Sequence, residues 1–190
     1  MPASLQRLLH DRFPAIVLWL QIPPAVAVLL FFGVEHFYYR LFPVLLLLGG
    51  SLFLLPRFVS GPLRFVPPLF YFGLISLLSA TTTRTSRPVT GFVFHPAEFF
   101  FLALLLAWAL TRSPGSRPLR TVAIVLGLCA IAGGLDEGHQ SFVPGRVADP
   151  LDGLLDLLGA IAGVAFFHVL PRAVRVPATE TAGTHERIPA

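Results

Sequence analysis

The sequence contains no lysine, a single cysteine and few charged residues of any kind. All fourteen basic residues are arginine, and charged residues make up only 13% of the 190-residue chain. A soluble domain carries about a quarter charged residues, so this composition argues against a soluble fold. The lone Cys129 cannot form an intramolecular disulfide. The net charge of +4 does not indicate a nucleic-acid partner, because the arginines lie between apolar runs.

Long apolar runs are what the sequence does contain, since 55% of its residues are hydrophobic. A helix that crosses a bilayer needs about 20 mostly apolar residues. The runs predict an all-α, polytopic membrane helix bundle with the bilayer itself as partner. Six spans are predicted, over residues 14–34, 37–56, 64–80, 91–110, 119–135 and 151–170. The first is expected to be retained, because it lacks a convincing signal-peptide cleavage site.

The distribution of arginine favours an orientation with both termini in the cytoplasm. Ten arginines then lie on the inner side and four on the outer side, namely Arg40, Arg84, Arg87 and Arg146. The fourth span would begin outside, bringing His95 and Glu98 to the membrane face where residues 136–156 lie. We therefore predict that two polar groups converge on the extracytoplasmic face of a bacterial-type plasma membrane.

The most polar stretch, residues 136–163, predicts two helices joined by a hairpin. It holds five of the chain's ten acidic residues: Asp136, Glu137, Asp149, Asp152 and Asp156. Charge is costly near a membrane, so such a cluster indicates a functional site. Val143, Pro144 and Gly145 are typical of a turn. Asp149 before Pro150 is typical of a helix N-cap.

The crowded carboxylates favour general acid/base chemistry, because they cannot all be ionised cheaply when partly buried together. Two of them could flank a glycosidic bond in a lipid-linked sugar. Arg146 suits a phosphate or a carboxylate. The predicted catalytic residues are Asp136, Glu137, His139, Glu98 and His95. The predicted substrate-binding residues are Gln140, Arg146, Asp152 and Asp156.

Several alternatives stay open at this point. His95, His139 and two carboxylates could hold a divalent metal. No HExxH spacing is present, so no cofactor is expected. The polar residues could instead form a structural network between helices. The protein could also bind a lipid or glycopeptide without turnover. A transporter is less favoured, because no inverted repeat is visible.

The polar stretch resembles the signature of the VanZ-like membrane proteins. That signature runs roughly D-E-x-x-Q-x-F-x-P-x-R, with an Asp six residues on and then N-x-x-G. Here it is matched by DEGHQSFVPGR from Asp136, followed by Asp152 and Gly159. An earlier family element, roughly D-K-x-x-H-x-x-E-Y, resembles His95-x-x-Glu98-Phe99. The match covers roughly residues 70–170. The sequence departs from the pattern at three places: Gly91-Phe92 replace Asp-Lys, Phe99 replaces Tyr, and Asp156 replaces Asn.

The resemblance implies a four-helix membrane core over residues 65–172, preceded by a two-helix extension over residues 1–64. Residues 173–190 are polar and predict a disordered cytoplasmic tail. The family takes its name from a protein associated with resistance to the glycopeptide teicoplanin. The resemblance to this family therefore implies a target in the cell envelope, such as a lipid-linked or glycolipid substrate. Within this core, Gly159 and Gly163 form a GxxxG pair, which is typical of close helix packing.

Overall fold

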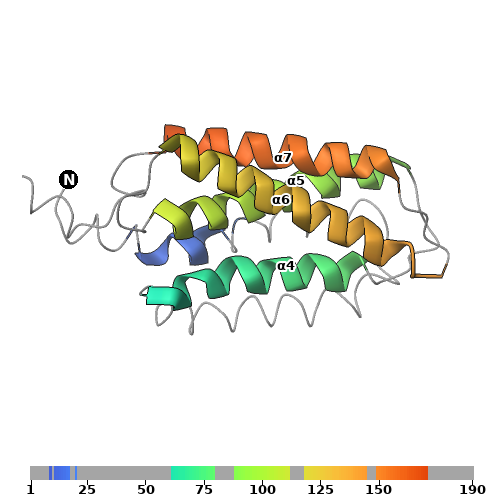
Figure 1. The fold of residues 1–190 in the computed structure, drawn as a ribbon, viewed down its shortest axis with the longest axis horizontal. Coiled ribbons are helices and arrows are strands. Elements are labelled where there is room, and N and C mark those ends of the chain that lie inside the picture. The colour runs from blue at the N-terminus through green and yellow to red at the C-terminus, as the bar shows by residue number, and fades with distance from the viewer. Residues whose placement is uncertain are drawn as a thin grey trace, which may run out of the picture.

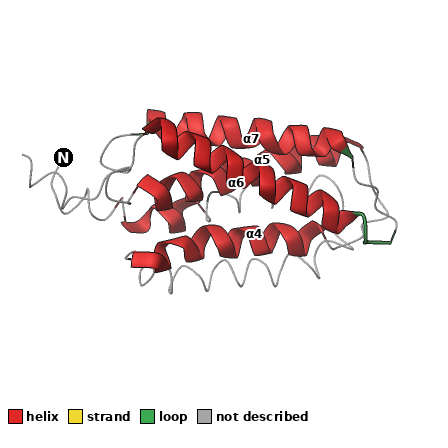
Figure 2. Cartoon of the chain, in the orientation of Figure 1, coloured by secondary structure: helices red, strands yellow, loops and turns green. Residues whose placement is uncertain are grey.

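The described part of the chain is a bundle of membrane-type helices. A computed structural model describes residues 9, 11–17, 20, 61–79, 88–111, 118–144 and 149–170, and regular structure there is entirely helical (Figure 2). The helices lie side by side along the long axis of the molecule (Figure 1). Three stretches are long and apolar enough to cross a membrane: Phe94–Thr111, Pro118–Gln140 and Pro150–Val169. They confirm the all-α class and the last three predicted spans. Most of the first two predicted spans and the tail lie outside the described residues.

The predicted third span begins with a 3-10 helix and continues as an α-helix. The 3-10 helix η2 (Gly61–Phe65) leads directly into α4 (Val66–Ser79), which has 14 residues. At 1.5 Å per residue the described part of α4 is about 21 Å long, and η2 adds about 10 Å before it. Pro67 and Pro68 fall in its first turn, where a missing backbone N–H costs no helical hydrogen bond.

The central helix is α5 (Pro88–Thr111), which packs against α4, α6 and α7. Its residues are buried on every side over most of its second half, with Leu105 and Trp108 almost fully inaccessible. A helix that is apolar all round is typical of such a buried position. Because α5 is surrounded, any polar side chain that it carries must be satisfied by the neighbouring helices.

The two flanking helices, α6 (Pro118–Gln140) and α7 (Pro150–Val169), each bury one stripe toward the bundle. The α6 stripe runs from Thr121 through Cys129 to Asp136 and Gln140. Large apolar side chains such as Ile131 stay exposed on its outer face, which suits a lipid environment. In Figure 1, α6 crosses in front of α5 from upper left to lower right, while α7 runs along the top of the bundle.

The hairpin between α6 and α7 is fixed by hydrogen bonds at its base. The Asp149 side chain accepts a hydrogen bond of 2.9 Å from the Leu151 N–H, and Pro150 follows as the first helical residue. This confirms the predicted N-cap. The backbone N–H of Asp149 also donates to Glu137 Oε2 at 2.9 Å. The last turn of α6 is thereby joined to the first residue before α7.

Candidate functional site

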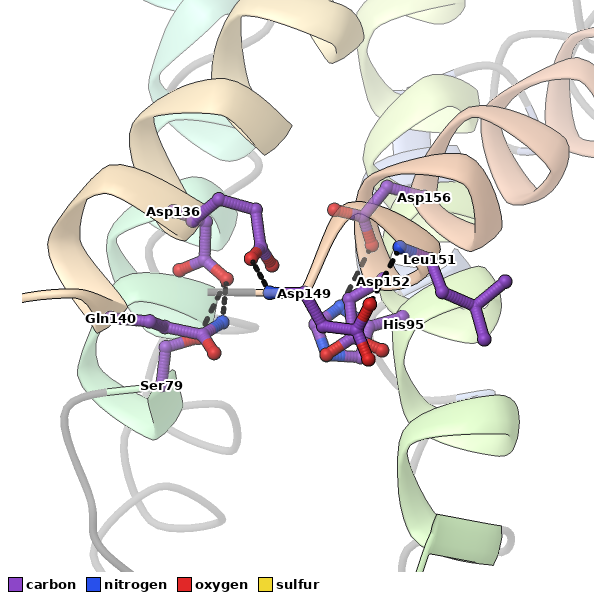
Figure 3. A network of polar contacts seen from close by, with 9 residues as sticks. Ser79, His95, Asp136, Gln140, Asp149, Leu151, Asp152 and Asp156 are labelled. Carbon is purple, nitrogen blue, oxygen red and sulfur yellow. Dashed lines mark hydrogen bonds and ion pairs between the residues drawn. The ribbon is translucent and has the colours of Figure 1, made fainter. Parts of the chain in front are cut away.

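His95 lies between two aspartates of α7, near the start of the apolar part of α5. Its Nδ1 is 2.9 Å from Asp156 Oδ1, and its Nε2 is 3.3 Å from Asp152 Oδ2 (Figure 3). His95 is only 7% exposed and Asp156 only 2%. An imidazole with a carboxylate at each nitrogen either donates two N–H groups as imidazolium or leaves one carboxyl protonated. In either case the group holds one proton more than a neutral imidazole beside two carboxylates, in a buried, low-dielectric place.

Asp136 forms a second group with α4 and with its own helix. Its Oδ2 accepts hydrogen bonds from Ser79 Oγ at 2.9 Å and from Gln140 Nε2 at 2.7 Å. Asp136 is 1% exposed, and its Oδ1 has no hydrogen-bond partner among the described residues. The contact with Ser79 joins the end of α4 to the end of α6, so Asp136 has a packing role whatever its chemistry.

Glu137 lies between these two groups and is half-buried. Its Oε2 accepts the Asp149 N–H, whereas its Oε1 is buried without a hydrogen-bond partner in the described part of the chain. One ring nitrogen of His95 and one oxygen each of Asp136 and Glu137 lie within 4.8 Å of one another. The predicted convergence of the start of the fourth span with the hairpin carboxylates is therefore confirmed. The side of the membrane on which they meet stays a prediction.

Two glycines of α7 bring this helix close enough to α5 for the contacts of His95 to form. A Cβ built on Gly159 would overlap the carbonyl oxygen of Pro96, the residue after His95, and one on Gly163 would overlap that of Phe100. The predicted close packing at the GxxxG pair is thus confirmed. A third glycine, Gly133 of α6, lies against Asp156, since its Cβ would be 3.1 Å from Asp156 Oδ2.

The remaining predicted site residues have different surroundings. Glu98 is half-buried one turn after His95 on α5 and contributes to its electrostatic environment. His139 is exposed, whereas Asp136 and Gln140 on the same helix are buried. His139 therefore does not share the buried face of α6 that Asp136 and Gln140 occupy, and only the latter two take part in the cluster. Arg146 lies outside the described residues.

Ser79 is a member of the cluster that the sequence analysis missed. It is 6% exposed and is the last residue of α4. Serine is common in membrane helices, and no acidic residue lies near it in the sequence. Only the packing of α4 against α6 shows that Ser79 faces Asp136.

Comparison with known proteins decides the family. The sequence profile of the VanZ/LLP1 family matches residues 26–171, which include α4 to α7 and every residue of the polar cluster. The chain belongs to the VanZ/LLP1 family. No curated protein and no solved structure matches it. The match to the VanZ/LLP1 profile begins before the predicted four-helix core, so the division at residue 64 stays a prediction.

Proposed function

We propose that this VanZ/LLP1 protein is a membrane-embedded enzyme that uses acid/base chemistry on the head group of a lipid-linked cell-envelope molecule. One observation carries the proposal: a buried histidine, His95, lies between Asp152 and Asp156 inside a bundle of membrane helices. Ionisable groups buried among membrane helices carry a large desolvation cost and generally mark functional sites. The expected reaction class is hydrolysis or group transfer, because both need a proton donor and a proton acceptor.

Glu137 is the residue best placed to exchange a proton with a substrate. It is half-buried, whereas Asp136 and Asp156 are almost fully inaccessible. One of its oxygens is held by the Asp149 N–H, which orients the carboxyl group, and the other makes no hydrogen bond with the described residues. We infer that Glu137 acts as the general acid or base, and that the proton held by the His95 group supplies or receives the matching proton.

The other predicted residues take supporting roles in this proposal. Gln140 and Ser79 hold Asp136 at the base of the site. Glu98 adds negative charge near His95. Arg146 would bind an anionic group of the substrate through paired hydrogen bonds, and His139 would act at the exposed rim. An extracytoplasmic site would give access to envelope lipids, as the arginine distribution predicts.

Lipid mass spectrometry tests this proposal. The full-length protein, in detergent or nanodiscs, is incubated with a bacterial membrane lipid extract beside the Glu137→Gln and Asp149→Asn variants. Asp149→Asn is the matched control, because it removes a neighbouring carboxylate while asparagine still caps α7. We expect a product with wild type and Asp149→Asn, and at least 100-fold less with Glu137→Gln.

The alternative function predicts a different pattern in the same experiment. If the protein binds a lipid without turnover, one lipid species would be retained equally by wild type and Glu137→Gln, and no product would form. That result would overturn the enzymatic proposal. A link to teicoplanin would appear as altered susceptibility of a host that expresses wild type, with the change absent for Glu137→Gln.

A further inference from the structure

Three carboxylate oxygens in the cluster are buried without a hydrogen-bond donor among the described residues. They are Asp136 Oδ1, Glu137 Oε1 and Asp156 Oδ2. Two of them belong to side chains that are at least 98% buried, since Asp136 is 1% and Asp156 2% exposed. A buried anionic oxygen without a partner is strongly unfavourable, and its presence in a native fold calls for a cation or another donor. The described neighbours Ser79 and Gln140 already donate to the other oxygen of Asp136.

The geometry brings a nitrogen and two oxygens to one place. His95, Asp136 and Glu137 each offer one atom to a group whose members lie within 4.8 Å of one another. Ligands about 2.0–2.2 Å from a shared tetrahedral metal lie about 3.3–3.6 Å apart, so no pair of these atoms has to close by more than about 1.5 Å. His95 belongs to α5, whereas Asp136 and Glu137 belong to α6.

The surroundings of His95 match those of a metal-binding histidine. Its Nδ1 is held by Asp156 at 2.9 Å, which fixes the ring and leaves Nε2 as the nitrogen for a ligand bond. Metal-binding histidines generally donate their second ring N–H to a carboxylate in this way. Asp152 Oδ2 lies 3.3 Å from Nε2, close to the spacing of two ligands on one tetrahedral ion.

We propose that His95, Asp136, Glu137 and Asp152 bind one divalent transition-metal ion, with Asp156 positioning His95. The imidazole favours zinc over magnesium and calcium, the three carboxylates also suit manganese, and the absence of a thiolate from this set disfavours soft ions. The set differs from the one that the sequence suggested, because the exposed His139 is replaced by a third carboxylate. Glu137 is a ligand when the ion is bound and is free to act as the acid or base of the proposed function when the ion is absent. The metal site therefore goes beyond the proposed function and does not depend on lipid turnover.

Equilibrium binding of Mn²⁺ to the full-length protein in nanodiscs tests the site. Free Mn²⁺ is followed by electron paramagnetic resonance, and Zn²⁺ is then added as a competitor. We expect one Mn²⁺ per chain, displaced by Zn²⁺, with at least 10-fold weaker binding for both Glu137→Gln and Asp156→Asn. Asp149→Asn removes a carboxylate from the same hairpin and should bind within 2-fold of wild type. Absence of saturable binding, or unchanged binding by Glu137→Gln, would overturn the proposal.

A second measurement covers the case in which a variant does not fold. Zn²⁺ bound to the native state should raise the Tm of the wild-type protein in a concentration-dependent manner. An unchanged Tm in a large excess of Zn²⁺ over the protein would contradict the site without any variant, because a saturating ligand that binds only the native state stabilises it. Metal binding without lipid products would refute the proposed enzyme and keep the metal site. Lipid products without metal binding would refute the metal site and support the proposed enzyme.

Discussion

Replacing Gly159 with alanine tests how closely α5 and α7 must approach for the site to form. An added Cβ would overlap the Pro96 carbonyl oxygen and lie 2.6 Å from Pro96 Cα. The obstacle is backbone, so it cannot turn away as a flexible side chain would. Pro96 follows His95, and Gly159 lies one turn after Asp156. Any separation of the helices at this point therefore also lengthens the 2.9 Å contact between His95 and Asp156.

The expected magnitude combines three effects. Overpacking costs about 1–3 kcal/mol, and a backbone obstacle favours the upper half of that range. Weakening one buried hydrogen bond adds about 1 kcal/mol. Alanine gains about 1 kcal/mol over glycine through helix propensity. The balance predicts that Gly159→Ala lowers the free energy of unfolding by about 2 kcal/mol.

The matched control is Gly153→Ala on the same helix. A Cβ at Gly153 would have no atom within 4 Å, so this variant should be neutral or more stable by up to about 1 kcal/mol. Both variants are compared with wild type by denaturant unfolding in detergent micelles, followed by tryptophan fluorescence from the buried Trp108. Equal stability of Gly159→Ala and Gly153→Ala would refute the close approach of the two helices.

Two further predictions concern the neighbours of the cluster. Ser79→Ala removes one hydrogen-bond donor to the buried Asp136 and should destabilise the protein by about 1 kcal/mol in the same unfolding assay. An unchanged free energy of unfolding would contradict the contact between α4 and α6. Gly133→Ala places a Cβ 3.1 Å from Asp156 Oδ2, and should weaken Mn²⁺ binding about 10-fold by displacing that carboxylate. The control is Gly134→Ala, whose Cβ would have no atom within 4 Å, and it should bind Mn²⁺ as tightly as wild type does. Equal Mn²⁺ affinities of Gly133→Ala and Gly134→Ala would contradict the prediction.

Much of the fold could be predicted because membrane helices leave a strong signal in the sequence. The last three spans appear as long, mostly apolar runs, and their predicted ends differ from those of α5, α6 and α7 by at most five residues. The cap at Asp149 follows from a local rule, since Asp before Pro is suited to the start of a helix. The meeting of His95 with the hairpin carboxylates followed from topology, because both groups fall at the same end of consecutive spans.

The partners of individual side chains could not be predicted, because they depend on how far each helix is rotated. α5 is apolar on every side, so its sequence does not show which face His95 occupies. His139 and Gln140 are adjacent and equally polar, yet only Gln140 is buried. Residues 64–80 are predicted as a span, but Ser79 at its end gives no signal of its partner in the sequence.

A double-mutant cycle between His95 and Asp156 shows whether α5 and α7 together form one polar site. The free energy of unfolding is measured for wild type, His95→Ala, Asp156→Ala and the double variant. Residues in direct contact should give a coupling energy of about 1–3 kcal/mol. As the control, a second cycle combines His139→Ala with Asp156→Ala. His139 is exposed, so its coupling energy with Asp156 should be below about 0.5 kcal/mol. A coupling energy between His95 and Asp156 as small as that of the control would show that α5 and α7 do not form one polar site.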